Sequence, residues 1–103
     1  MVRREMIRCF VKRPGQMGNI RFVCNTLPDL QQIVGGPIEC IALDAKTILI
    51  CNECGKHMNL PVNFPIEDDL IVGTAIITGL SSDDFSSLRW TEDRCRQFVG
   101  ETA

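Results

Sequence analysis

The residues best suited to chemistry lie together in one short segment, Cys51-Asn52-Glu53-Cys54-Gly55-Lys56-His57. Two thiols stand three positions apart, a glycine follows the second thiol, and the only histidine of the chain comes three positions after it. Two cysteines at this spacing can bind one Zn²⁺ from a tight turn, and glycine adopts the backbone angles that such a turn needs. The segment therefore predicts half of a zinc site.

The other half of this site must come from residues outside the cysteine pair. His57 is within reach of the same loop, and the fourth ligand would be Cys24 or Cys40, each on a strand that can run nearby. A site closed by protein ligands leaves no open position for a reactive water, so the Zn²⁺ would be structural. The spacing thus predicts a zinc clip at the end of a strand.

Two other interpretations of the segment stay open. In the first, Cys51 packs in the core while Cys54 and His57 are solvated. In the second, the two cysteines form a redox pair, which needs its first thiol at a helix N-terminus that lowers the thiol pKa. The following Asn59-Leu60-Pro61 leaves little room for such a helix.

The sequence offers few residues for catalysis beyond this segment. It has one histidine and no tyrosine, and it shows neither a glycine-rich phosphate loop after a strand nor paired carboxylates in a pocket-like context. We therefore expect a protein that binds a partner rather than an enzyme.

The length of the chain, 103 residues, predicts a single domain, 1–103, with one modest core. No apolar run approaches the ~20 residues needed to cross a bilayer, and the N-terminal residues lack the apolar region of a signal peptide. We expect a cytoplasmic protein. In a reducing compartment the six cysteines are buried small side chains or metal ligands rather than disulfides.

Charge is unevenly distributed along the chain, whose formal net charge is −2. The N-terminal stretch is basic and contains Arg3, Arg4, Arg8, Lys12, Arg13 and Arg21. The later loops are acidic and contain Glu67, Asp68, Asp69, Asp83 and Asp84. With Phe64 beside them, the acidic residues predict contact with a basic groove of a partner protein, whereas Arg8, Lys12 and Arg13 predict nucleic-acid contacts as the alternative. Solvated faces and loops are the more common explanation of such charge runs.

Apolar periodicity predicts the elements that position these residues. Alternation indicates a hairpin of strands 6–12 and 20–24, and helical spacing after a possible cap at Asn25 or Thr26 indicates a helix that Gly35-Gly36 ends. Strands 38–43 and 47–51 follow. The two prolines in 59–69 indicate an ordered loop there, and the apolar residues 70–79 indicate a strand near the middle of the sheet. Thr91 caps a last helix that ends at Gly100.

The order β-β-α-β-β-β-α indicates an α+β fold. We expect a mostly antiparallel sheet of about five strands, with the two short helices packed on one face of the sheet.

Several runs of the sequence resemble one known family. The runs are Asn25-Thr26-Leu27, Leu30-Gln31, Val34-Gly35-Gly36-Pro37-Ile38-Glu39, Ile48-Leu49-Ile50-Cys51-Asn52-Glu53, Gly55-Lys56, Leu60-Pro61-Val62-Asn63 and Ile71-Val72-Gly73-Thr74-Ala75. Together, over residues 4–98, they are similar to an uncharacterised small domain family of phages, prophages and plasmids of Gram-positive bacteria. Members usually read Cys-Asn-Glu-Glu-Gly-Lys, so Cys51 matches the family pattern while Cys54 and His57 depart from it.

The resemblance implies an accessory protein of a mobile element, and the family has no assigned reaction to carry over. With the acidic loops and the small catalytic inventory, it leads to one expectation: non-enzymatic binding that inhibits a host anti-phage defence nuclease complex, of the anti-CRISPR or anti-restriction type. The alternative is a zinc-stabilised nucleic-acid-binding regulator that uses the basic N-terminal hairpin.

Overall fold

The computed structural model describes residues 5–101. Within that range the chain forms these elements in order: β1 (Met6–Lys12), β2 (Asn19–Cys24), α1 (Leu27–Val34), β3 (Ile38–Asp44), β4 (Thr47–Asn52), β5 (Val62–Ile66), β6 (Asp69–Val72), β7 (Ala75–Ser81), β8 (Asp84–Ser86) and α2 (Glu92–Phe98). No helix in this part of the chain is long and apolar enough to span a membrane.

The main sheet is antiparallel throughout, with the strand order β2-β1-β7-β4-β3, and short β8 pairs with β7. Strands β5 and β6 form a separate two-stranded hairpin. The predicted α+β class, the mostly antiparallel sheet and the two helices are confirmed. The predicted strand pairs β1–β2 and β3–β4 are confirmed as well.

The predicted apolar strand over 70–79 is divided into two strands, β6 and β7. The chain bends at Gly73, whose φ of +74° lies in the left-handed region that favours glycine. The residues before this bend pair with β5, and the residues after it form the central strand of the main sheet, as expected for its position.

The segment 59–69 was expected to be a loop, but it contains β5 and the start of β6. Its prolines argued against a strand because proline cannot donate to a β-ladder. Pro65 is accommodated because this hairpin has two strands only, so each strand has a free edge.

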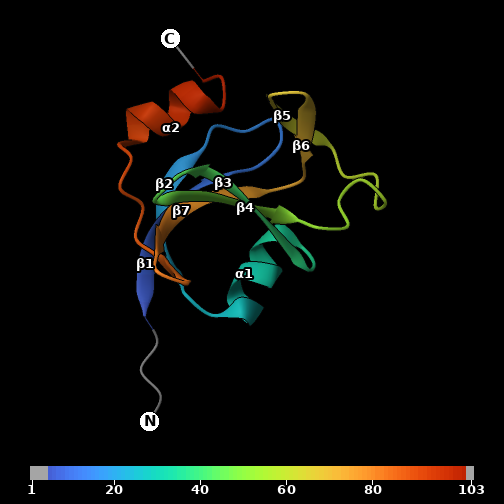
Figure 1. Ribbon diagram of the computed structural model, residues 1–103. Coiled ribbons are helices and arrows are strands. Elements are labelled where there is room, and N and C mark those ends of the chain that lie inside the picture. Colours follow the sequence, from blue (N-terminus) through green and yellow to red (C-terminus); the bar gives the residue numbers. More distant parts are fainter. Residues whose placement is uncertain (1–4, 102–103) are drawn as a thin grey trace.

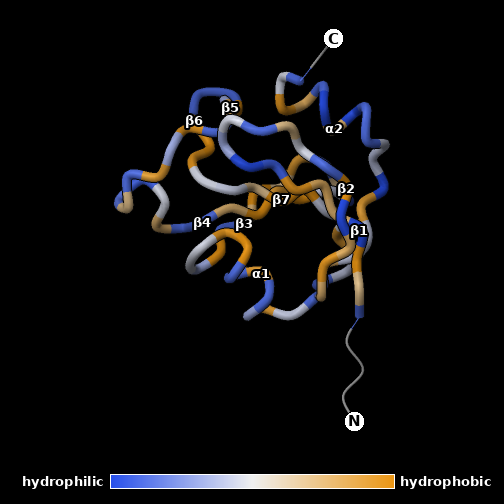
Figure 2. The backbone as a smooth tube through the Cα atoms, turned by 180° about the vertical axis from the view of Figure 1, so that it is seen from behind, coloured by the Kyte–Doolittle hydropathy of each residue, from blue (hydrophilic) through white to orange (hydrophobic). Residues whose placement is uncertain are grey.

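The helices lie on opposite faces of the sheet, which corrects the expectation that both pack on one face (Figure 1). Leu30 and Val34 of α1 pack in a cluster with Ile76 of β7. Cys95 of α2 packs in a second cluster with Ile77, the next residue of β7. Because β7 carries buried apolar side chains on both of its faces, each face needs its own cover. Figure 2 shows the hydrophobic residues concentrated along these central strands.

Both helices begin at the predicted type of cap. The Thr26 hydroxyl accepts a hydrogen bond from the N–H of Asp29, and the Thr91 hydroxyl accepts one from the N–H of Arg94. Gly35 ends α1 with a φ of 85°, and its N–H donates to the carbonyl of Gln31. The helix boundaries are therefore set by local sequence.

Trp90 joins the segment before α2 to the β3–β4 turn. Its indole N–H donates to Oδ2 of Asp44 at 2.9 Å, and its ring packs edge-on against Phe98 with the ring centroids 5.5 Å apart. The backbone N–H of Lys46 and then the Trp90 indole hold the pKa of the Asp44 carboxyl below its usual range.

This lowered pKa predicts an acid transition that the single tryptophan reports. The stability that the Asp44 carboxylate contributes is present above the ordinary aspartate pKa of about 3.9 and is lost as the pH falls through the lowered value. Fluorescence of Trp90 should change over that acidic range, and the Asp44→Asn variant should lack this change because its side-chain carbonyl accepts the bond without titrating. An identical transition in both proteins would contradict the assignment.

Candidate functional site

The segment that follows β4 is organised by the buried side chain of Asn52. Its Nδ2 donates to the carbonyl of Val34 at the end of α1 at 3.2 Å, and its Oδ1 accepts from the N–H of Cys54 at 2.8 Å. A Cβ on Gly36 would lie 2.9 Å from Asn52 Nδ2. A larger residue at position 36 would therefore collide with the Asn52 amide. Asn52 therefore ties the end of α1 to the turn that carries the cysteine pair.

Other residues of the resembling runs also have a structural role around this turn. A Cβ on Gly55 would approach Val72 Cγ2 to 2.8 Å. Asn63 Nδ2 donates to the carbonyls of Lys12 at 2.8 Å and Gly73 at 2.9 Å, which joins the β5–β6 hairpin to the main sheet. These short approaches and buried bonds give a physical reason for glycine and asparagine at these positions.

The Cys51 thiol is buried at the end of β4 and faces a carboxylate. Its Sγ lies 3.8 Å from Oε2 of Glu39, the residue directly opposite on β3. Burial, and then the charge of Glu39, raise the pKa of Cys51 to about 11. The thiol is therefore protonated at neutral pH, which disfavours its use as a nucleophile.

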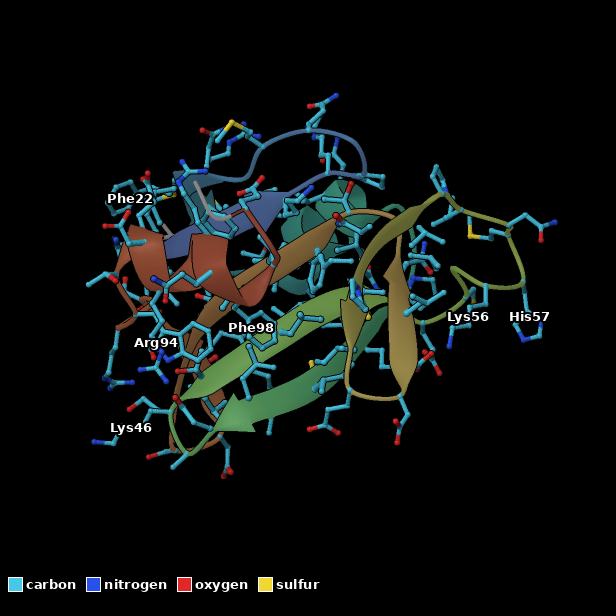
Figure 3. The ribbon with its side chains drawn as sticks, turned by 90° about the horizontal axis from the view of Figure 1, so that it is seen from above. Phe22, Lys46, Lys56, His57, Arg94 and Phe98 are labelled. Atoms are coloured by element: carbon cyan, nitrogen blue, oxygen red, sulfur yellow. The ribbon has the colours of Figure 1, made fainter. Side chains whose placement is uncertain are left out.

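The predicted zinc ligands are not brought together. Cys24 is on β2, three strands away from β4, or roughly 14 Å at the usual strand spacing. Cys40 pairs with Ile50, so its side chain lies on the opposite face of the sheet from Cys51. His57 is exposed, and Figure 3 shows it at the far side of the projecting turn.

Within residues 5–101 there is no group of three or more histidine, cysteine, aspartate or glutamate side chains that could hold a metal ion. The residues present, Cys54 included, therefore do not fit a structural zinc site. Spacing alone did not reveal this, because it does not fix on which face of the sheet each thiol lies.

A small cavity of about 240 Å³ lies beside the turn, between β3, β4 and β6. Its polar lining residues are Glu39, Cys51, Asn52, Glu53, Lys56, His57 and Asp69. Lys56 and Asp69 form an ion pair at its mouth, and both side chains are exposed. Such a pair contributes little to stability because water screens it.

A larger groove of about 700 Å³ lies between β3, the β5–β6 hairpin and α2. We call it the acidic groove. Its apolar lining includes Ile41, Leu43, Ile66 and Phe98, all packed against the core, and Phe98 projects from α2 toward this side of the sheet in Figure 3. Its rim carries Glu67, Asp68 and Asp69 at the tip of the hairpin. Sequence reasoning found the acidic rim, and it missed the apolar lining because the three elements that supply it are far apart in the chain.

Phe64 does not lie on the surface of this groove, although it was predicted to contact a partner. Its side chain is only 2% exposed and packs edge-on against Phe98, with ring centroids 6.1 Å apart. Phe64 therefore fastens the hairpin to the core, because a phenylalanine at this position of β5 points inward.

The predicted acidic surface is divided between two hairpins. Asp83 and Asp84 belong to the β7–β8 turn, away from the acidic rim of the β5–β6 hairpin. The Asp84 carboxylate accepts from the N–H of Phe85 at 2.8 Å and lies 3.4 Å from Asn25 Nδ2. These two residues shape their own turn and do not extend the groove.

The basic N-terminal hairpin is committed largely to internal contacts. Arg8 donates to the carbonyls of Leu88 and Trp90, at 3.2 and 2.9 Å. The Lys12 side chain is buried, and its Nζ donates to the carbonyls of Arg13 and Gln16.

Lys12 is buried and Arg8 is half-buried, so of the three predicted contact residues only Arg13 is exposed. Two further basic residues of this stretch, Arg3 and Arg4, lie outside the described residues.

The role of Asn52 predicts a clear loss of stability on its removal. The Asn52→Ala variant leaves the Val34 carbonyl and the Cys54 N–H without their partner, which costs about 1–3 kcal/mol. The free energy of unfolding from denaturant titration measures this loss. The matched control is Asn19→Ala at an exposed position, which should change stability by less than about 0.5 kcal/mol. Equal stability of the two variants would contradict the role.

The positions of the cysteines also predict the metal content. Protein purified in the presence of zinc should retain much less than one zinc per chain by elemental analysis, and a chelator should leave its melting temperature unchanged. The variants Cys51→Ser and Cys54→Ser should match the parent in metal content. One zinc per chain, lost in both variants, would show that the turn rearranges to bind metal.

Comparison with known proteins places the chain in a family. No curated protein matches it, and no solved structure does. The model of the family described as Domain of unknown function (DUF3846) matches residues 7–99. This match covers nearly the whole sheet and both helices, and the chain belongs to the DUF3846 domain family.

Proposed function

We propose that this protein acts by binding rather than by catalysis, as an accessory protein of a phage or a related mobile element in the cytoplasm of a bacterial host. Its proposed partner is a host defence complex that cuts nucleic acid. Binding would block access of the nucleic acid and so inhibit cleavage.

The acidic groove is the observation that carries this proposal. Proteins that process nucleic acids hold the phosphate backbone in basic grooves. The rim residues Glu67 and Asp68 present the opposite charge at the tip of an exposed hairpin, and Asp69 beside them is paired with Lys56. Such charges speed association with a basic surface and compete with the phosphates for it. The apolar lining beside the rim adds the contact area that charge alone does not supply.

The state of the thiols supports binding over covalent chemistry. Burial raises the pKa of Cys9, and it raises the pKa values of Cys51 and Cys95 to about 11. A nucleophilic cysteine needs the reverse, because the thiolate is the reactive form. These three cysteines therefore act as small core side chains.

The proposal predicts inhibition that depends on the rim. Purified protein added to defence nuclease complexes from bacterial hosts should block cleavage by one of them. The triple variant Glu67→Gln, Asp68→Asn, Asp69→Asn should inhibit at least about tenfold less well, because lost charge complementarity slows association and weakens binding. Higher salt should weaken inhibition by the parent more than inhibition by the variant.

A matched control removes the same charge elsewhere. The variant Glu5→Gln, Asp83→Asn, Asp93→Asn changes three exposed acids outside the groove and should inhibit within about twofold of the parent. If the rim variant inhibits as well as the parent, or if no such complex binds the protein, the proposal is wrong. Salt-sensitive binding to free DNA or RNA would instead favour the regulator alternative.

A further inference from the structure

The acidic groove runs beside a strand edge that no other strand covers in the described part of the chain. Strand β3 ends the order of the main sheet and pairs with β4 alone. The β5–β6 hairpin lies across the groove from β3 without pairing to it. An open edge of this kind is a template for one more strand.

The register identifies the backbone groups that this edge presents. Glu53 donates its N–H to the carbonyl of Pro37 at 2.8 Å, which makes the pair 37–53 a hydrogen-bonded one. Hydrogen-bonded and non-hydrogen-bonded pairs alternate along an antiparallel ladder. The pairs Glu39–Cys51 and Ile41–Leu49 are then hydrogen-bonded, and the pairs of Cys40 and Ala42 are not. The N–H and C=O groups of Cys40 and Ala42 therefore point away from β4, toward the open edge.

Side chains on β3 alternate in the same way. Glu39 and Ile41 lie on the face of the groove, and Leu43, at the irregularity between Ala42 and Asp44, also lines the groove. Cys40 and Ala42 are small and exposed on the edge strand. An added strand would thus direct every second side chain over the apolar lining toward the acidic rim, and the others beside Cys40 and Ala42.

The charge of this region indicates which kind of segment would bind at the edge. Strand β3 carries Glu39 and Asp44 and no cation, and the rim adds Glu67, Asp68 and Asp69. Lys56 pairs with Asp69 and Arg94 lies 3.9 Å from Asp44, so the charge open to a partner is mainly that of Glu39, Glu67 and Asp68. Pairing of β3 with a second copy of itself would bring like charges together, which is unfavourable. Lysine or arginine side chains suit the site better, because their aliphatic stems can cover Ile41 and Leu43 while their charged ends reach the rim.

We propose that an extended basic segment of the partner adds to the open edge of β3 as a further strand, with its lysine or arginine side chains lying in the acidic groove. This inference rests on the proposed function, and it names the form in which the partner is bound. Backbone hydrogen bonds to Cys40 and Ala42 supply part of the affinity, and the rim supplies the preference for basic side chains.

A synthetic peptide that alternates lysine and valine is the probe. Fluorescence anisotropy should show that it binds the full chain, and a peptide that alternates glutamate and valine should not bind. The decisive comparison uses a lysine–valine peptide N-methylated at every residue, which keeps the side chains and their charge but has no backbone N–H to donate to the edge from either side. It should bind at least about tenfold more weakly. Equal binding of the two lysine peptides would overturn the proposal.

A pair of variants tests the same edge from the side of the protein. Cys40→Pro removes one outward N–H and leaves the bonds to β4, because proline is tolerated where the N–H of an edge strand faces solvent. Cys40→Val keeps that N–H and is the control. The proline variant should lose the peptide at least about tenfold, and the valine variant should bind within about twofold of the parent. If the proline variant does not fold, the N-methylated peptide decides alone.

The outcomes separate this inference from the proposed function. Nuclease inhibition that is lost in the rim variant but unchanged in Cys40→Pro would overturn the added strand and leave the proposed function standing. Edge-dependent peptide binding without inhibition of any nuclease complex would overturn the proposed target and keep the strand-addition site. Sedimentation that shows a dimer, abolished by Cys40→Pro, would overturn the proposal in favour of a second copy at the edge.

Discussion

The burial of strand β7 on both faces is the constraint on which the rest of the structure depends. Ala75, Ile76, Ile77 and Thr78 are each no more than 1% exposed. The polar member, Thr78, is satisfied because its hydroxyl lies within hydrogen-bond distance of the carbonyls of Arg8 and Ser86. A strand of this kind needs apolar cover above and below, and α1 and α2 supply it on opposite sides.

This two-sided core leaves the sheet with two edges of different character. The β2 edge carries the exposed side chain of Phe22 and lies on the far side of the sheet from the turn that holds Lys56 and His57 (Figure 3). The β3 edge borders the acidic groove, because the β5–β6 hairpin lies across the groove from β3. Phe64 and Phe98 hold that hairpin against α2. The walls of the groove are therefore packed on the core.

The elements were predictable from the sequence where a local signal sets them. Thr26, Thr91 and Gly35 set the ends of the helices through caps and a left-handed residue, and alternation identified the β1–β2 hairpin. Strands β3 and β4 were identified as apolar runs on either side of a turn. The 70–79 strand was placed correctly in the middle of the sheet, but its division required knowing that Gly73 adopts a positive φ. A glycine alone does not report its backbone angles.

The site was less predictable because it depends on which face each side chain occupies across distant strands. Cys51 and Cys40 were grouped by residue type, although their register places them on opposite faces. Lys12 looked like a surface cation, yet its Nζ is taken up by the carbonyls of Arg13 and Gln16. The acidic rim was found because Glu67, Asp68 and Asp69 are contiguous in sequence, whereas its apolar lining comes from three separate elements.

A sheet that is covered on both faces leaves the edge of β3 open beside an acidic groove. Amide hydrogen exchange of the free protein, followed residue by residue by NMR, tests this most directly. The amides of Cys40 and Ala42 should exchange rapidly, while those of Glu39 and Ile41, which bond to β4, should exchange slowly. Slow exchange at Cys40 and Ala42 in the monomeric protein, equal to that at Ile41, would show that the edge is already covered and would contradict the account.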